Sequence, residues 1–327
     1  MSGPLPAGFT VGHWTDLEAV TGCTVVLPPE EGAVAAADVR GGGASTRELE
    51  LLSPLANARA IHGVLLTGRS AFGLAAADGV VRWLEAQDRG YRTFGGLVPL
   101  VPGAVVYDLL TGDPSRRPGP DEGWAACEAA RDDPELGSVG AGTGVAVGKL
   151  FGRESAVKAG VGLAAQDLPH GPRLAALAVV NAFGDVIAED GSVLAGTRGE
   201  EGEFLHTEHL LRTRVYEPPS YLRGPPSGNT TLICLMTDAE LSKVDCGIVA
   251  KMAHAGMARA VNPVHSAVDG DVVFAMASCS AIAVDPLIVG VAAAGVTAEA
   301  IRDACRQAGS AGGIPSLSEL SGAGSGT

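Results

Sequence analysis

An unbroken apolar segment, TLICLMT at residues 231–237, sets the strongest limit on the architecture of this chain. Its length and continuous apolarity predict a strand that is buried on both faces. Directly before it, a loop of Pro, Ser and Gly ends in Asn229 and Thr230. A buried strand does not need small polar residues at its start, so this junction requires its own explanation.

The composition indicates a globular α/β protein with a core of small aliphatic side chains. The 327 residues suit two average domains or one large α/β domain. Hydrophobic residues make up 46% of the chain but aromatic residues only 4%, so Ala, Val, Leu and Ile must fill the core. The 46 glycines follow no fixed period, which excludes collagen-like and solenoid architectures and favours tight turns and close packing.

The net charge and the distribution of cysteines limit the binding partners and the cellular compartment that we expect for this protein. The net charge of −14, without a basic cluster, argues against non-specific nucleic-acid binding. The six cysteines are widely spread and form no CxxC pair. Residues 1–10 lack the features of a signal peptide, and no apolar segment approaches the length of a membrane span. We therefore expect a cytoplasmic protein with reduced thiols that binds neither nucleic acid nor membranes.

Short strand-like segments alternate with longer helical patterns along the chain. Residues 23–29 and 32–40 are expected to form adjacent strands joined by a Pro-Glu-Glu-Gly turn. Ser70 is expected to cap a helix over 70–87. A capping-box pattern, Ser242 with Asp245, precedes a helix that reaches about residue 259. The other expected elements are strands within 62–68, 97–109, 173–187 and 271–276, and helices over 123–132 and 297–307.

Residues 190–229 are rich in Gly, Glu and Pro and show little apolar periodicity, which predicts an exposed, poorly ordered linker.

Three other segments resemble known motifs without satisfying them. Thr143 and Leu150 break the phosphate-loop pattern of GAGTGVAVGK. The nucleophile-elbow spacing of GRSAFG (68–73) is wrong by one residue. HTEH (206–209) lacks an obvious third metal ligand, so we expect a solvated loop there.

Two interpretations of the Asn229–Thr230 junction remain open. The junction is either a polar turn that enters a strand or a hidden N-terminus. Cleavage of the 229–230 bond would give Thr230 a hydroxyl nucleophile and a free α-amine on one residue. An α-amine with a pKa of about 7.7 to 8.0 is partly neutral at pH 7, so it can act as the base for that hydroxyl. Such an enzyme needs no catalytic histidine, and the linker upstream would let the new chain ends separate.

The segment that contains this junction, residues 228–275, strongly resembles the L-aminopeptidase/D-esterase (β-peptidyl aminopeptidase) family. That family includes the nylon-oligomer hydrolases and is related in fold to the ornithine acetyltransferases. The likeness covers nearly the whole chain, with motifs in the family's order. They are VGHWTD (11–16), GAVAAADVRGGGASTRE (32–48), LTGRSAFGLAAADGVVRWLE (66–85), VVYD (105–108), GAGTGVAVGK (140–149) and VVNAFGDV (179–186).

The resemblance implies a single α/β domain over residues 1–327, built as an αββα sandwich in which two sheets pack between helices. It also implies self-cleavage between Asn229 and Thr230, which would give a larger chain (1–229) and a smaller one (230–327). Subunits of the family associate, so we expect a homo-oligomer of processed heterodimers. We expect no cofactor and no metal.

The resemblance also implies a set of site residues. Thr230 matches the nucleophile, Lys149 the lysine near it in nylon-oligomer hydrolases, and Asn181 the asparagine that donates to the oxyanion. From the residues alone, Lys149 is otherwise a surface lysine and Asn181 a structural hydrogen-bond donor. Asp269 and Asp271 match the pair that would orient the Thr230 amine; a common Asp-Gly turn is the alternative. Tyr107 matches a tyrosine that shapes the substrate pocket.

These features predict a self-processing amidohydrolase that cleaves small peptides, amino-acid amides or ω-amino-acid oligomers through an acyl-enzyme on Thr230. The aminopeptidase branch uses Ser as nucleophile and a Ser with an acidic residue in place of the Asp pair, so its substrate preference cannot be transferred. Two alternatives remain: an acyltransferase of the ornithine acetyltransferase type, and a non-catalytic binding or scaffold protein on the same fold.

Overall fold

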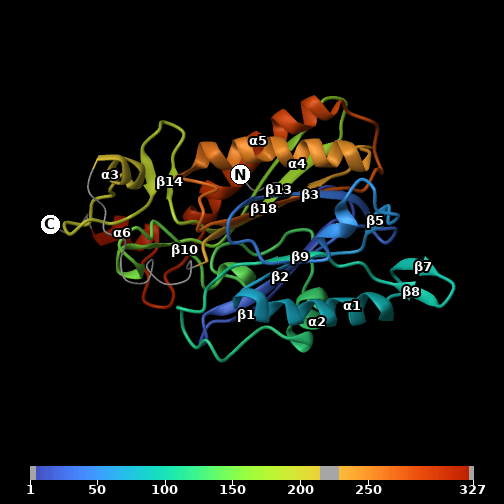
Figure 1. Cartoon of the computed structure of the whole chain (residues 1–327), viewed down its shortest axis with the longest axis horizontal. Helices are drawn as coiled ribbons and strands as arrows, with labels where there is room; N and C mark the ends of the chain where they lie inside the picture. Colours follow the sequence, from blue (N-terminus) through green and yellow to red (C-terminus); the bar gives the residue numbers. More distant parts are fainter. Residues whose placement is uncertain (1–4, 214–227, 324–327) are drawn as a thin grey trace.

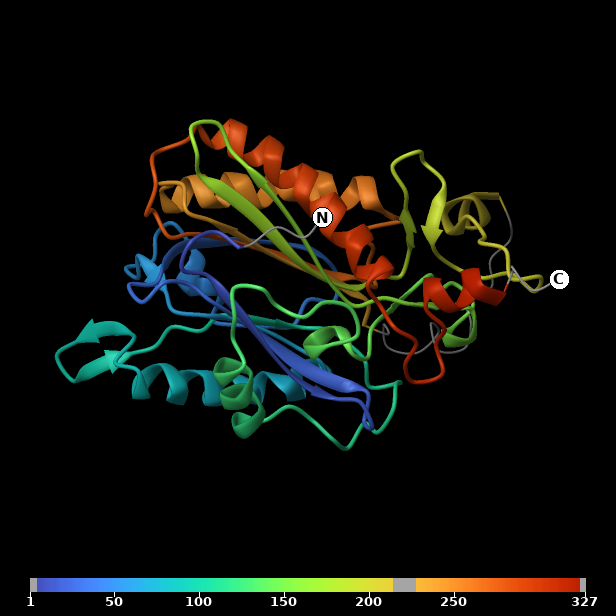
Figure 2. The ribbon, with the colours of Figure 1, turned by 180° about the vertical axis from the view of Figure 1, so that it is seen from behind.

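The computed structural model describes residues 5–213 and 228–323. Two β-sheets lie face to face in its centre, and a pair of helices covers the outer face of each sheet (Figure 1). The view from behind shows the same four layers (Figure 2). This αββα sandwich confirms the architecture predicted from the sequence.

The larger sheet contains the strand that the apolar segment predicted. This strand, β16 (Thr230–Thr237), pairs in parallel with β18 (Gly270–Ala277) and antiparallel with β13 (Arg173–Asn181). Every residue of β16 is buried, because helices cover one face of the sheet and the second sheet covers the other. The strand order is β12 (Val161–Asp167), β13 (Arg173–Asn181), β16 (Thr230–Thr237), β18 (Gly270–Ala277), β3 (Ala33–Gly41) and β5 (Ala60–Ile61).

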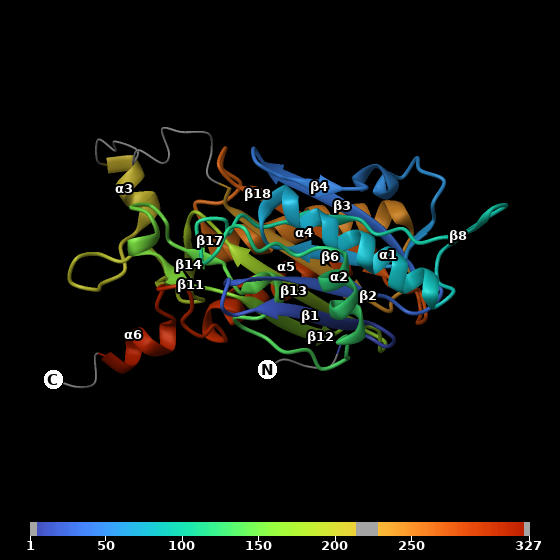
Figure 3. The same ribbon diagram turned by 90° about the horizontal axis from the view of Figure 1, so that it is seen from below.

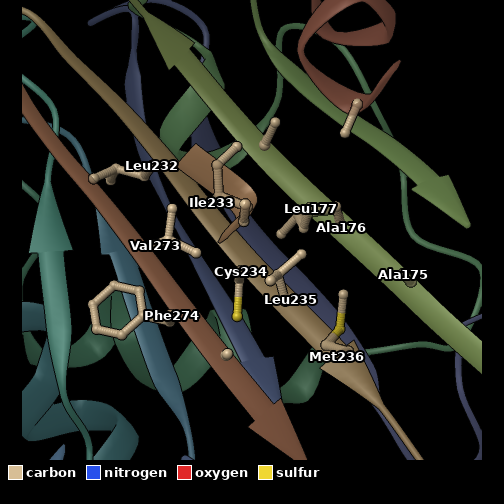
Figure 4. Packing of buried hydrophobic residues seen from close by; sticks show 14 of the residues in the cluster. Ala175, Ala176, Leu177, Leu232, Ile233, Cys234, Leu235, Met236, Val273 and Phe274 are labelled. Carbon is tan, nitrogen blue, oxygen red and sulfur yellow. The ribbon is translucent and has the colours of Figure 1, made fainter. Parts of the chain in front are cut away.

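Figure 4 shows the core along this sheet, where the side chains of β16 lie between those of β13 and β18. Leu232, Leu235 and Met236 pack here among small partners such as Ala175 and Ala176. The core is therefore aliphatic, as the low aromatic content indicates. All six cysteines are free thiols.

The smaller sheet and its helices form the other half of the sandwich. Its strand order is β1 (Thr10–Asp16), β2 (Thr21–Leu27), β6 (Val64–Thr67), β9 (Gly103–Val105) and β4 (Thr46–Arg47). Figure 3 shows α1 (Ala76–Ala86) and α2 (Pro120–Glu128) across this sheet. On the opposite side of the molecule, α4 (Lys243–Ala260) and α5 (Pro286–Arg306) cover the larger sheet.

Glycine allows the helices of each pair to approach closely. A Cβ at Gly256 of α4 would lie 2.0 Å from the carbonyl oxygen of Ala294 in α5. A Cβ at Gly123 of α2 would lie 1.9 Å from the carbonyl oxygen of Ala76 in α1. These contacts leave no space for a side chain, so the close packing of each helix pair requires glycine at these two positions.

The remaining elements are short. β14 (Asp185–Ile187), β15 (Val193–Ala195) and β17 (Val261–Asn262) form a small sheet that lies with α3 (Thr207–Thr213) at one end of the sandwich (Figure 1). The others are β7 (Tyr91–Thr93) with β8 (Gly96–Val98), β10 (Ala146–Val147) with β11 (Val157–Lys158), α6 (Leu317–Ala323), and the 3-10 helices η1 (Leu49–Leu52), η2 (Ser70–Ala75), η3 (Gly140–Gly142) and η4 (Arg153–Ser155). Among the helices of the described residues, none combines the length and apolar character that crossing a membrane requires.

The predicted hairpin of residues 23–29 and 32–40 is wrong. Both strands exist, but β2 pairs with β1 and β6, whereas β3 pairs with β18 and β5 in the other sheet. The turn therefore carries the chain from one layer to the next. A turn sequence predicts where the chain reverses, but it does not specify which sheet receives the following strand.

The predicted helix cap at Ser70 is also wrong. Residues from Ser70 onward form η2 before α1 begins, and the N-cap position belongs to Arg69, without a side-chain capping bond. Arg69 itself is fully buried. Its guanidinium donates hydrogen bonds to the carbonyl oxygens of Ala19, Asp108 and Thr111, which fixes the start of η2 against two other loops.

The expected lack of order is wrong for residues 190–213, which contain β15 and α3, although many of these residues are exposed. Asp185 holds this segment, because its carboxylate accepts hydrogen bonds from the buried backbone amides of Thr197 at 2.9 Å and Thr207 at 2.7 Å. His206 and His209 are exposed as expected, but His209 lies in α3 and not in a loop. Residues 214–227 of the expected linker lie outside the described residues.

Candidate active site

Three strand ends meet at one edge of the larger sheet. β16 begins at Thr230 and its parallel neighbour β18 at Gly270, so both starts lie on the same edge. The antiparallel neighbour β13 ends there at Asn181, which pairs with Thr230. Asn229 and Asp269 extend the pairing by a parallel bridge just before the two strands. Strand topology therefore gathers residues that are far apart in the sequence.

The carbonyl oxygen of Asn229 accepts two hydrogen bonds. The Thr230 hydroxyl donates to it at 2.6 Å, and the backbone N–H of Gly270 donates to it at 2.7 Å. The backbone N–H of Asn229 donates to the carbonyl oxygen of Val268 at 3.1 Å, which holds the peptide in place. Asn229 and Thr230 are each only 4% exposed. The hydroxyl thus lies against the preceding carbonyl in a largely dehydrated site.

Hydrogen bonds to both Oδ1 and Nδ2 fix the orientation of the Asn181 side-chain amide. Its Oδ1 accepts hydrogen bonds from Lys149 Nζ at 2.9 Å and from the backbone N–H of Ala146 at 3.2 Å. Its Nδ2 donates to the carbonyl oxygens of Tyr107 at 3.1 Å and Gly228 at 3.4 Å. Because donors surround one end and acceptors the other, Nδ2 faces the segment that leads into β16.

Lys149 reaches the site from the loop after β10. Its backbone N–H donates to the carbonyl oxygen of Phe183 at 3.1 Å, and its Nζ also donates to the carbonyl oxygen of Asn181 at 2.8 Å. Burial lowers the pKa of Lys149 to about 7; the charge of Asp269 opposes this shift and that of Arg153 adds to it. The ammonium group therefore titrates near neutral pH.

Both oxygens of Asp271 are held by donors. Oδ1 accepts a hydrogen bond from the backbone N–H of Thr231 at 2.7 Å. Oδ2 accepts one from the backbone N–H of His265 at 3.2 Å and lies 2.8 Å from its Nδ1. This buried carboxylate links the start of β16 to the loop before β18. The backbone of Thr231 is thereby held in position.

Asp269 makes a separate set of contacts. Its Oδ1 accepts from the backbone N–H of Phe183 at 3.3 Å, and its Oδ2 accepts from the backbone N–H of Ser266 at 3.1 Å and from the Ser266 hydroxyl. Burial and the nearby charge of Asp271 raise the pKa of this carboxyl group, while those hydrogen bonds lower it. The two aspartates therefore have different environments, although only Gly270 separates them in the sequence.

A cavity of about 420 Å³ opens beside this cluster. Tyr107, the predicted pocket residue, lies on its wall, as do Lys149, Asn181 and Asn229. The rest of the wall combines apolar and charged side chains: Leu110, Phe151, Phe183 and Ile314 with Arg153 and Glu154. The polar cluster is thus continuous with a space large enough for a small substrate.

The structure brings the five predicted catalytic positions, Lys149, Asn181, Thr230, Asp269 and Asp271, to one edge of the sheet. Their catalytic roles remain predictions.

Sequence reasoning missed the partners that hold the aspartates and the peptide, namely His265, Ser266 and Gly270. A signal for Ser266 existed: a Ser three residues before Asp269 is a common turn pattern. The bond from Gly270 to the Asn229 carbonyl comes from strand pairing and has no local sequence signal.

Comparison with known proteins identifies the chain as a peptide-bond hydrolase. Residues 7–316 match Peptidase family S58, and the chain belongs to this family. An uncharacterized aminopeptidase of Mycobacterium tuberculosis is 38% identical over 340 aligned positions, which cover 96% of each chain. A 6-aminohexanoate-oligomer endohydrolase of Kocuria sp. is 30% identical over 274 positions, which cover 82% of this chain and 72% of that protein.

Solved structures share the fold. A β-aminopeptidase of Burkholderia sp. superimposes with a TM-score of 0.71 at 21% identity, covering 99% of this chain and 95% of that one. An L-aminopeptidase D-Ala-esterase/amidase of Ochrobactrum anthropi, described as a variant of the Ntn hydrolase fold, gives a TM-score of 0.71 at 22% identity, covering 96% of this chain and 90% of that one. The sandwich therefore has the same fold as these two structures.

Proposed function

We propose that this protein is a self-processing amidohydrolase in which Thr230 is first the agent of chain cleavage and then the N-terminal nucleophile. One observation carries the proposal: the Thr230 hydroxyl and the Gly270 N–H both contact the carbonyl oxygen of Asn229, at 2.6 and 2.7 Å. The nucleophile is thus adjacent to the carbonyl group, and a backbone donor already lies on the oxygen that would become negative.

In the maturation step, Thr230 Oγ attacks the Asn229 carbonyl carbon, and the hydroxyl proton passes to the Thr230 nitrogen. The C–N bond breaks and an ester forms in its place. Water then hydrolyses the ester, which leaves a carboxylate on Asn229 and a free amine and hydroxyl on Thr230. The Gly270 N–H stabilises the oxyanion of the first step, because it points at that oxygen before the reaction begins.

In the matured enzyme, the Thr230 amine takes the hydroxyl proton as Oγ attacks a substrate amide. The proton passes to the leaving amine, and water releases the acyl group from Oγ. Asp269 and Asp271 fix the amine. Asn181 stabilises the oxyanion with Lys149 behind it. In the uncut chain, Asn181 Nδ2 donates to Gly228 at 3.4 Å, so withdrawal of the new chain end would free that donor for substrate.

The family and the cavity support the proposed substrate class. The relatives named above are an aminopeptidase and a hydrolase of 6-aminohexanoate oligomers. A cavity of about 420 Å³ with partly apolar walls suits small peptides, amino-acid amides or ω-amino-acid oligomers. A panel of these three classes would rank them by kcat/KM.

Mass spectrometry of the purified protein tests the proposal. We expect two fragments, with the smaller one beginning at Thr230, and Thr230→Ser should still cleave. Thr230→Ala should remain intact and inactive.

Thr231→Val is the matched control. The buried Thr231 Oγ has no hydrogen-bond partner among residues 5–213 and 228–323, and Val keeps its shape. This variant should mature normally. Full amidase activity in an intact wild-type chain would refute the proposal.

A further inference from the structure

The cavity beside the candidate site contains one permanently charged cation, Arg153. Its other lining residues that carry charge near neutral pH are Glu154 and Lys149, whose ammonium group titrates in that range. Arg153 is therefore the group of this lining that is best suited to bind an anion.

Arg153 has unused hydrogen-bonding capacity. Its guanidinium carries five N–H groups, and Nη2 donates to the carbonyl oxygen of Gly312 at 3.1 Å. No carboxylate of residues 5–213 or 228–323 lies within ion-pairing distance of it. The equally cationic Arg69 differs, because its buried guanidinium donates to four carbonyl oxygens and lies 3.6 Å from Asp108.

The surroundings of Arg153 disfavour an unpaired cation. The residue is half-buried, and this loss of hydration lowers the pKa of its guanidinium. The charges of Glu154 and Asp108 act in the opposite direction, but from beyond ion-pairing distance. An anion placed in the cavity would supply the missing partner, and a carboxylate matches the guanidinium fork in two parallel hydrogen bonds.

We propose that Arg153 binds a carboxylate of the substrate and thereby selects substrates that carry one. The identity of the ligand as a substrate rests on the proposed amidohydrolase function; the binding of a carboxylate does not. The apolar walls contributed by Leu110, Phe151 and Ile314 would hold the hydrocarbon that links this carboxylate to the scissile amide. The carboxylate is either the C-terminus of a short peptide or oligomer, or an acidic side chain.

Kinetics of the matured enzyme distinguish the two sources. For the C-terminal source, alanyl-alanine should be hydrolysed with a kcat/KM about tenfold or more above that of alanyl-alanine amide. For the side-chain source, aspartyl amide should exceed asparaginyl amide by a similar factor. Either preference should disappear in Arg153→Gln and persist in part in Arg153→Lys, which keeps the charge but loses the fork.

The matched control is Arg131→Gln, which removes the same charge from an exposed ion pair with Glu135. It should leave both preferences unchanged. If the wild-type enzyme hydrolyses these substrates without either preference, or if Arg153→Gln keeps the preference, the inference is wrong.

A binding measurement separates this inference from the proposed function. Hexanoate and 1-hexanol cannot be hydrolysed and differ in the carboxylate, so an NMR titration tests the cavity whether or not the enzyme cleaves amides. We expect hexanoate to bind the wild-type protein at least tenfold more tightly than hexanol does, and Arg153→Gln to abolish the difference. Equal binding of the two probes to the wild-type protein would overturn the inference even in an active amidase.

Discussion

Asn181, the last residue of β13, lies directly opposite Thr230, the first residue of β16. The ladder between these strands continues to the pair Leu174 and Thr237, so the whole run of buried pairs determines which residues meet at its end. The amide of Asn181 and the hydroxyl of Thr230 are therefore placed by a continuous ladder of buried strand pairs, which suits groups that must be oriented before a reaction.

Asn181→Asp should reduce kcat strongly in chains that have matured. The carboxylate keeps an acceptor for Lys149 and Ala146 but has no N–H for the oxyanion. Loss of one oxyanion donor typically lowers kcat by about 10²- to 10³-fold. The exposed Asn57→Asp is the control for the same chemical change. A kcat within a few-fold of the wild-type value would remove Asn181 from the mechanism.

The stability of the uncut chain should depend on the protonation of Lys149. Its pKa is about 7 in the folded chain and 10.5 as an unperturbed group, so between these values the unfolded chain binds more protons. The free energy of unfolding should therefore rise with pH across this window, by at most about 1.4 kcal/mol per pH unit. Below pH 7, both states are protonated and this contribution is constant.

Urea denaturation from pH 6 to pH 9 tests this prediction in a Thr230→Ala background, which keeps the chain uncut. The comparison is with the same chain carrying Lys149→Met, which cannot titrate. The difference in unfolding free energy between the two chains should change in favour of lysine as the pH rises above 7. A difference that does not vary with pH would contradict the assigned pKa.

Asp271→Asn should destabilise the fold by about 1 to 3 kcal/mol, because its amide would present a donor where both carboxylate oxygens now accept. Asp190→Asn is the matched control. Asp190 also accepts hydrogen bonds from backbone and side chain, at Ser192, but on the exposed surface, where we expect a change within about 0.5 kcal/mol. Chemical denaturation of both variants measures the difference; equal losses would argue against a special role for Asp271.

Arg69→Met should be among the most destabilising single changes, at about 3 to 5 kcal/mol, because it leaves the buried carboxylate of Asp108 without its cation. The effect of Arg69→Met with Asp108→Asn should be smaller than the sum of the single effects. Arg212→Met, which breaks an exposed ion pair with Glu208, should change stability by less than about 1 kcal/mol. Additive effects in the double-mutant cycle would disprove the coupling.

Local sequence patterns correctly predicted those helices and strands whose formation is determined by residues within the element itself. The continuous apolarity of 231–237 identified β16, and Ser242 with Asp245 marked the start of α4, where the capping box is present. The resemblance to known hydrolases indicated candidate site residues, whose catalytic roles stay predictions. The strand and the helix start were predicted correctly because burial on both faces and helix capping are encoded within a few residues.

Other features depend on partners distant in the sequence, and there local patterns were misleading. Residues 190–213 look like a linker by composition, yet Asp185 supplies acceptors that order them. The sequence by itself therefore determined the aliphatic core, the buried strand and the family of hydrolases. The tertiary structure alone decided which sheet each strand joined, and it brought Gly270 onto the Asn229 carbonyl and Arg153 into the cavity. The reason is physical: strand pairing and side-chain convergence arise from contacts across the chain, which no short segment specifies.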